Sequence, residues 1–301
     1  MESGPHFRRD DDGEAEPYTA AMLREFTKMH GLGNDFVVFD ARAEAFTLTT
    51  AQVVALADRH TGIGCDQLIV IEPSARATAF MRIWNADGSM AAACGNAARC
   101  VATLLGGAAT IDSDGGLLDA TVAAGAASIV YPPPRFDWTT IPLAYAVDTT
   151  DVPAAWSDGG AELAHGVTVN VGNPHIVFFV ADTAAVPLKV LGPRIETDAL
   201  FPDRVNVGVA QIVDRSRLLL RVWERGAGLT RACGTGAMAA AVAAIVTRRT
   251  SSPVTVTLPG GDLTVGWAGG AITLAGPAAT SFTGTVDIPM TVRDHAAAEA
   301  A

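Results

Sequence analysis

Long apolar stretches are absent from this sequence of 301 residues. A helix needs about 18 consecutive apolar residues to span a membrane, and the longest candidate, 237–246, is followed closely by Arg248 and Arg249. Positive charge is also scarce: the chain contains 21 Lys and Arg against 32 Asp and Glu, which gives a formal net charge of −11. Nucleic acids and anionic membranes attract positive surfaces. The sequence therefore favours a small-molecule partner, with no nucleic acid and no membrane.

Cysteine is rare as well, and the chain contains only Cys65, Cys94, Cys100 and Cys233. Residues 1–21 are rich in charged side chains and lack the apolar stretch of a secretory signal. We expect them to form a disordered leader before a start at Met22, and we expect 291–301 to form a tail. Few cysteines without such a signal indicate free thiols and a cytoplasmic location. The spacing of Cys94 and Cys100 does not fit a zinc site, so no metal is predicted.

The spacing between Cys94 and Cys233 recurs along the chain, and we call it the repeat offset. It relates Arg82-Ile83-Trp84 and Ala93-Cys94-Gly95 to Arg221-Val222-Trp223 and Ala232-Cys233-Gly234, Gly33-Asn34 to Gly172-Asn173, and Gln67 to Asn206. Self-similarity at a fixed offset indicates an internal repeat. The sequence therefore predicts two copies of one structural half.

Each half combines several strands with one helix. Apolar, partly β-branched runs predict strands at 36–40, 67–72, 79–84, 176–180, 205–212, 218–223, 254–258, 262–267, 271–274 and 282–288. Helix-forming runs follow each Ala-Cys-Gly at 96–105, which stops at Gly106-Gly107, and at 235–247, which is apolar on every face. Such a helix must be enclosed. We therefore predict an α+β protein in which a mostly antiparallel sheet or barrel surrounds a central helix in each of two pseudo-symmetric domains.

Three consecutive prolines at 132–134 break both helix and strand and mark the boundary between the halves. We expect the first half to span 22–136 and the second 137–277. A strand at 278–290 is expected to return to the first half.

Cys94 and Cys233 each precede a glycine at the N-terminal end of a predicted helix. Unpaired backbone N–H groups and the positive end of the helix dipole gather there, and they favour both a thiolate and a bound carboxylate. If the halves face one another, the two sulfurs approach one α-carbon from opposite sides. One thiolate could then remove the α-proton while the other thiol donates a proton. The sequence therefore predicts a racemase or epimerase that uses two cysteines as acid and base.

Other polar residues at strand ends or turns fit a zwitterionic ligand, namely Asn34, Gln67, Asn85, Asn173, Asn206, Glu224 and Arg225. Amides offer donors and acceptors, Glu224 suits an ammonium group, and Arg225 suits a carboxylate. Each also has an ordinary structural explanation, since Asn is common in turns. Taken alone, His175 is better explained as an ordinary semi-buried histidine, and the repeat, which places these residues near the cysteines, favours a role at the site.

At these residues the chain resembles the diaminopimelate epimerase family over 22–288. Seven ordered motifs carry the resemblance: KMHGLGNDF at 28–36, GIGCDQ at 62–67, NADGS at 85–89, ACGNAARC at 93–100, GNPH at 172–175, RVN at 204–206, and ERGAG at 224–228 with ACGTG at 232–236. Three departures, at Ala97, Pro133 and Leu229, remove no functional group.

The resemblance implies interconversion of LL- and meso-diaminopimelate, in lysine and peptidoglycan precursor biosynthesis, by an isomerase that uses no pyridoxal phosphate, no other cofactor and no metal. It implies a diaminopimelate epimerase-like fold and a homodimer. Cys94 and Cys233 would be the acid and base, and His175 and Glu224 would influence their thiols. Substrate contacts would come from Asn34, Gln67, Asn85, Gly95, Asn96, Asn173, Asn206, Glu224, Arg225, Gly234 and Thr235.

Two alternatives remain open at this point. A related cofactor-independent racemase, similar to proline racemase, would place its residues at the same two helix ends, but its ligand lacks a second amino-acid group. A thiol oxidoreductase would use Cys94 and Cys233 as a redox pair, although the chain contains no Cys-x-x-Cys motif.

Overall fold

The computed structural model describes residues 21–123 and 125–289. Its first elements are β1 (Ala21–Gly31), β2 (Asn34–Asp40), α1 (Thr50–Ala57), β3 (Gln67–Glu72), β4 (Ala79–Asn85), β5 (Met90–Ala91), α2 (Gly95–Leu105), β6 (Ala108–Asp112), β7 (Leu118–Ala123) and β8 (Ala126–Tyr131). Ala21, which we expected in the leader, begins β1. The remaining leader residues, 1–20, and the tail at 291–301 lie outside the described residues.

The second part of the chain repeats this order of elements from β10 to β17, with β9 before the repeat and β18 after it. It contains β9 (Val152–Asp158), β10 (Ala161–Asn170), β11 (Pro174–Phe179), α3 (Leu188–Glu196), β12 (Asn206–Ile212), β13 (Arg217–Glu224), β14 (Gly228–Leu229), α4 (Gly234–Val246), β15 (Val254–Leu258), β16 (Gly261–Trp267), β17 (Ile272–Pro277) and β18 (Ala279–Pro289). None of the helices in the described ranges is long and apolar enough to cross a membrane.

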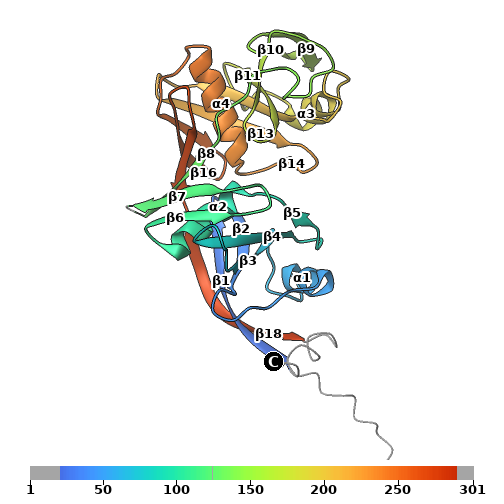
Figure 1. The fold of residues 1–301 in the computed structure, drawn as a ribbon. Helices are drawn as coiled ribbons and strands as arrows, with labels where there is room; N and C mark the ends of the chain where they lie inside the picture. The colour runs from blue at the N-terminus through green and yellow to red at the C-terminus, as the bar shows by residue number, and fades with distance from the viewer. Residues whose placement is uncertain (1–20, 124, 290–301) are drawn as a thin grey trace, which may run out of the picture.

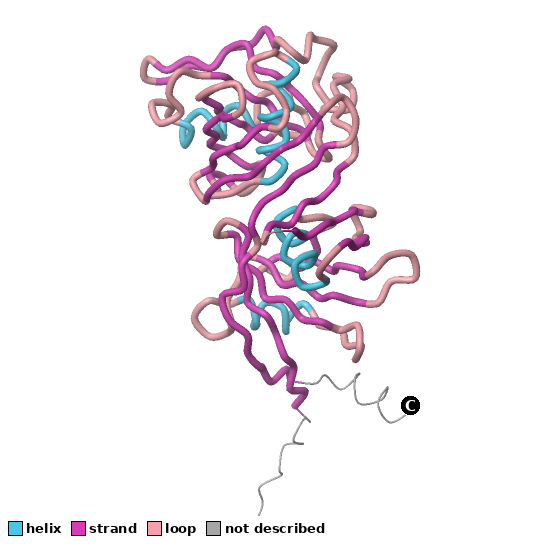
Figure 2. The backbone as a smooth tube through the Cα atoms, turned by 90° about the vertical axis from the view of Figure 1, so that its left-hand side faces the viewer, coloured by secondary structure: helices cyan, strands magenta, loops and turns pink. Residues whose placement is uncertain are grey.

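The strands form two lobes, one around α2 and one around α4 (Figure 1). Most neighbouring strands are antiparallel, and the parallel pairs are β2–β3, β4–β6, β11–β12 and β13–β15. The lobes are joined where β8 pairs with β17, with Tyr131 opposite Ile272, and the tube in Figure 2 shows strands running from one lobe to the other. β18 pairs antiparallel with β1 in the lobe of α2. The α+β fold is confirmed, while the limits of the two halves stay a prediction.

Strand register confirms the repeat. Phe36 lies opposite Gln67 in the parallel pair β2–β3, and His175 lies opposite Asn206 in β11–β12. Phe36 corresponds to His175, and Gln67 to Asn206, at the repeat offset. The repeat offset seen in the sequence is therefore a structural equivalence.

Each half has its own apolar core around its helix. The core of the second half surrounds α4, in which every residue from 236 to 244 is buried. The core of the first half surrounds α2, which buries 96–102 but leaves Leu104 38% exposed. α2 ends as expected at Gly106, whose φ of 73° suits a residue without a side chain. The prediction that α4 is enclosed by its own sheet is therefore confirmed.

Two helices were not predicted, and neither were several strands, including β6, β7, β8, β9 and β10. α1 begins with a capping box in which Thr49 and Gln52 exchange hydrogen bonds, and α3 contains Pro193. β9 and β10 pair as a hairpin, and β10 contains His165, whose φ is 56°. α1, α3 and the β9–β10 hairpin contribute to the two outer apolar clusters and lie away from Cys94 and Cys233 in sequence.

Candidate active site

The N-terminal ends of α2 and α4 open into one cavity of about 650 Å³. Predicted site residues line most of it, namely Asn34, Gln67, Asn85, Cys94, Gly95, Asn96, Glu224, Cys233, Gly234 and Thr235. The two helix ends are close, because a Cβ atom added at Gly234 would lie 4.0 Å from Oδ1 of Asn96. The expectation that both cysteines share one cleft is therefore confirmed.

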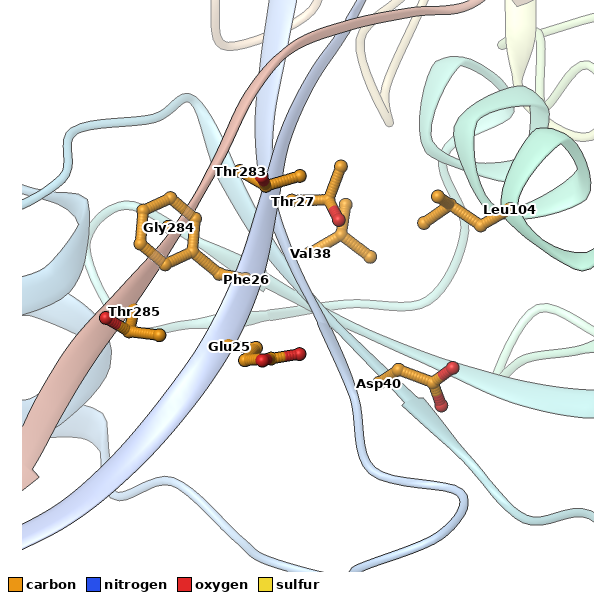
Figure 3. A pocket seen from close by; sticks show the side chains of 9 residues that line it. All are labelled: Glu25, Phe26, Thr27, Val38, Asp40, Leu104, Thr283, Gly284 and Thr285. Atoms are coloured by element: carbon orange, nitrogen blue, oxygen red, sulfur yellow. The ribbon is translucent and has the colours of Figure 1, made fainter.

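A second hollow, of about 560 Å³, lies between β1, β2, β18 and the end of α2 (Figure 3). Glu25, Asp40 and Leu104 are among its lining residues. It contains no residue that the sequence predicts for the site, so the chemistry is assigned to the cavity between α2 and α4.

Cys94 and Cys233 are each the N-cap residue of a helix. Cys94 and Cys233 both have extended backbone angles, with φ values of −149° and −131°. The backbone N–H of Gly236 donates to Sγ of Cys233 at 3.3 Å, and Oγ1 of Thr235 lies 3.5 Å from the same sulfur. An N-cap position directs the side chain toward the free N–H groups of the first turn. The repeated Ala-Cys-Gly motif thus places two thiols at two helix N-termini.

The acidity of the thiols differs from the sequence expectation. Burial raises the pKa of both Cys94 and Cys233, and the negative charge of Glu224 raises each further. Backbone N–H groups at the helix ends lower these pKa values, as predicted, but their effect is smaller than that of burial. The helix ends therefore act in the predicted direction, but burial outweighs them and the net shift raises the pKa of both thiols, contrary to the expected lowering.

Glu224 acts on both cysteines at once. It ends β13, lines the cavity and accepts a hydrogen bond from the hydroxyl of Thr230. Because its charge raises the pKa of both cysteines, any group that neutralises or displaces that charge makes both thiols more acidic.

In each half one hydrogen bond joins the Gly-Asn turn to the N-terminal end of the helix, although its direction differs between the halves. Nδ2 of Asn96 donates to Oδ1 of Asn34 at 3.0 Å, and Nδ2 of Asn173 donates to Oγ1 of Thr235 at 3.4 Å. Asn34 corresponds to Asn173, and Asn96 to Thr235, at the repeat offset. Each Gly-Asn turn is therefore fixed to the helix end of its own half.

Two more predicted residues meet on neighbouring strands. Nε2 of Gln67 donates to Oδ1 of Asn85 at 2.9 Å, and Nδ2 of Asn85 donates to Ser89. Oε1 of Gln67 is buried and has no hydrogen-bond partner among the described residues. A buried carbonyl oxygen without a partner costs free energy, so it is available to a ligand that carries a donor, such as an ammonium group.

His175 is buried and donates from Nε2 to Oδ1 of Asn173 at 2.9 Å, and neither residue is among those that line the cavity. Burial lowers the pKa of this imidazole to about 3, and the positive charge of Arg225 contributes to the same shift. His175 is therefore neutral at working pH and positions Asn173 without contributing charge.

Asn206 and Arg225 do not line the cavity. Nδ2 of Asn206 donates to the carbonyl of Pro174, and its Oδ1 accepts from the backbone N–H of Arg225. The guanidinium of Arg225 donates to the carbonyl of Asp203 at 2.9 Å. The sequence placed these residues at the right strand ends but could not show which way their side chains turn.

Several residues at the site were not predicted. Asp66, Thr230 and Arg231 line the cavity, Arg99 is buried within α2, and the buried hydroxyl of Tyr131 lies beside Gly95 at the start of that helix. Asp66, Arg99, Thr230 and Arg231 lie inside or beside the family motifs. That proximity was the only available signal, because neither burial nor side-chain direction follows from a motif.

Comparison with known proteins identifies the family. The family model described as diaminopimelate epimerase matches residues 26–131 and 167–279. The diaminopimelate epimerase of Rhizorhabdus wittichii is 60% identical over 269 residues, which cover 89% of this chain and 97% of that protein. The chain belongs to the diaminopimelate epimerase family. The family's enzyme from Sphingopyxis alaskensis is 58% identical over 267 residues, 88% of this chain and 98% of that protein.

Solved structures support the same fold. A phenazine biosynthesis protein of the PhzF family from Enterococcus faecalis superposes with a TM-score of 0.65 at 13% identity, covering 88% of this chain and 99% of that one. A hydroxyproline epimerase from Agrobacterium vitis, with bound trans-4-hydroxy-L-proline, gives 0.61 at 14% identity, covering 90% and 94%. At these identities the likeness concerns the fold alone. As a member of the diaminopimelate epimerase family, the chain is an isomerase.

Proposed function

We propose that this protein interconverts LL- and meso-diaminopimelate by moving a proton between Cys94 and Cys233, in the synthesis of lysine and peptidoglycan precursors. The observation that carries the proposal is the pair of cysteines, each an N-cap residue, that line one cavity between two equivalent helix ends. Inversion of a carbon centre needs an acid and a base on opposite faces, and two facing helix ends supply one group for each face.

The reacting carboxylate would lie between the two helix ends, close to Gly95-Asn96 and Gly234-Thr235. The free N–H groups and dipoles of α2 and α4 would stabilise the negative charge that moves onto this carboxylate as the α-proton leaves. Glu224 and the free oxygen of Gln67 would bind the α-ammonium group.

Substrate binding also explains how one thiol becomes a base. The α-ammonium group brings a positive charge to the carboxylate of Glu224, whose charge raises the pKa of both thiols. This compensation lowers both values. One cysteine could then lose its proton and abstract the α-proton, while the other, still protonated, donates to the opposite face.

The distal amino-acid group would be bound by Asn85, Asn173, Asn206 and Arg225. A guanidinium binds a carboxylate through two parallel hydrogen bonds. This role requires the side chain of Arg225 to leave the carbonyl of Asp203, to which it now donates. A ligand without a second carboxylate, such as proline, would not supply a partner for that movement.

A homodimer and a cytoplasmic location belong to the same proposal. Among the described strands β18 pairs with β1 alone, and Phe282 on β18 and Leu23 on β1 are 50% and 67% exposed. Exposed apolar side chains along an unpaired strand edge favour association with another chain. The four cysteines are free, which suits a reducing compartment.

Incubation with LL-diaminopimelate in D2O tests the proposed function. With excess reductant and no electron acceptor, we expect the meso isomer to form and deuterium to enter at the inverted carbon. Turnover that requires an electron acceptor would instead support a thiol oxidoreductase, and equal turnover of proline would support a proline racemase.

A further inference from the structure

Arg99 is a buried cation without a carboxylate partner. It lies in α2, its side chain is fully buried, and no described carboxylate forms an ion pair with it. Room for the guanidinium comes from glycines, since a Cβ atom at Gly31 would lie 3.1 Å from its Nη2 and one at Gly276 would lie 3.4 Å from its Nε. Burying an unpaired charge is costly, so a role for it should be visible nearby.

The guanidinium holds the first turn of α2. Nη2 donates to Oδ1 of Asn96 at 2.8 Å, and Nη1 donates to the carbonyl of Gly95 at 3.3 Å. Both residues line the cavity. Arg99 therefore contacts the two residues that follow Cys94 without lining the cavity itself.

A relay of hydrogen bonds continues from Arg99 to the rim. Nδ2 of Asn96 donates to Asn34, and Nδ2 of Asn34 donates to Oδ2 of Asp66 at 2.9 Å. The relay has a donor-only group, the guanidinium, at its buried end and an acceptor-only group, the carboxylate, at its exposed end. Both ends thus require the same orientation of the two amides between them. One N–H of each amide remains for a ligand in the cavity.

The second half lacks this device. Met238 stands where the repeat places Arg99, and Thr235 stands where it places Asn96. Asn173 is held there by Thr235 and the neutral His175. The repeat therefore places a fixed positive charge behind the end of α2 and an uncharged side chain behind the end of α4.

We infer that Arg99 is a positioning residue of the reaction, which acts through Asn96 to fix the amide of Asn34 toward the bound substrate. The inference rests on the proposed function, because it assigns Asn34 and Asn96 to the ligand. It adds a residue that does not touch the ligand and that serves only one of the two faces.

A double-mutant cycle tests the relay. Asn34→Ala should lower kcat/KM about tenfold in the native background, as expected for a lost hydrogen bond to a charged ligand. In the Arg99→Met background Asn34→Ala should lower kcat/KM less than about threefold, because the relay no longer fixes the amide of Asn34. Met is chosen because the equivalent position in α4 contains it. Arg99→Lys keeps a donor-only cation and should recover most of the activity that Arg99→Met loses.

Asn173→Ala is the matched control, since it occupies the position equivalent to Asn34 in the other half. Asn173→Ala should lower kcat/KM by the same factor in the native and Arg99→Met backgrounds, to within about twofold. If Asn34→Ala costs as much in Arg99→Met as in the native chain, the relay does not exist. If Arg99→Met does not fold, Arg99→Gln takes its place in the cycle with the same criterion.

A readout that needs no turnover separates this inference from the proposed function. The side-chain amide resonances of Asn34, assigned by their loss in Asn34→Ala, should shift in Arg99→Met and stay in place in Met238→Leu. Resonances that do not move on Arg99→Met would overturn the inference. A native protein without epimerase activity would overturn the proposed function while these spectra still decide the relay.

Discussion

Replacing Gly95 with alanine adds one methyl group at the first position of α2, next to Cys94. The new Cβ atom would lie 2.5 Å from the hydroxyl oxygen of Tyr131 and 3.6 Å from its Cζ. That hydroxyl is buried and has no hydrogen-bond partner among the described residues, and its ring packs against both cores. Either Tyr131 or the start of α2 must therefore move.

Gly234→Ala is the matched change in the other half. Its Cβ atom would lie 3.2 Å from Cδ2 of Leu274, which requires a shift of only a few tenths of an ångström. Overpacking costs about 1–3 kcal/mol, whereas alanine in place of glycine gains up to about 1 kcal/mol in a helix. We expect Gly95→Ala to lower the free energy of unfolding by about 1–2 kcal/mol relative to Gly234→Ala.

Urea unfolding and epimerase kinetics measure the two effects. A displacement of Cys94 of about 1 Å can lower the rate roughly 100-fold, so Gly95→Ala should also lose more activity than Gly234→Ala. Equal unfolding midpoints for the two variants would refute the packing argument for α2 and Tyr131.

Three further outcomes are expected. Arg225→Lys keeps the charge but loses the two parallel donors, so KM for diaminopimelate should rise about tenfold or more with stability nearly unchanged, and normal kinetics would place the distal site elsewhere. Glu224→Gln removes the charge that raises the pKa of Cys94 and Cys233. Iodoacetamide should therefore alkylate both thiols faster at pH 7.5 while the rate of epimerisation falls, and slower alkylation would contradict this. Burial lowers the pKa of His175 to about 3 in the folded chain, whereas the unfolded chain binds a proton there below about pH 6.5. The free energy of unfolding should therefore fall as the pH drops from about 6.5 to about 3. His175→Gln should flatten that fall, as measured by urea unfolding at pH 7 and pH 4.5, and an unchanged slope would show that other groups cause it.

The repeat made much of the site predictable. A cysteine followed by glycine and an apolar run specifies a helix with the cysteine at its N-cap, and the second copy of the motif, around Cys233, specifies a matching one. Equivalent positions then meet in one cavity. These inferences depend on local pattern and on symmetry, and both can be read from a sequence.

Burial and side-chain direction could not be read in the same way. The pKa of Cys233 rises because burial in the surrounding sheet and the charge of Glu224 outweigh the N–H groups of α4, and that balance depends on tertiary packing. Arg225 was predicted from its charge, but its contact with Asp203 depends on how the chain turns after β13. Arg99 lay in a family motif, yet its burial against Gly31 and Gly276 involves distant strands.

The central claim, that each cysteine serves one face of the α-carbon, is tested most directly by exchange in D2O with Cys94→Ala and Cys233→Ala. Each variant should lose epimerisation by at least the roughly 10²–10⁴-fold that a general acid or base contributes. Each should still exchange the α-proton of the stereoisomer that presents it to the remaining thiol, so the two variants should prefer opposite isomers. Near-native epimerisation by both single variants would contradict the two-cysteine mechanism.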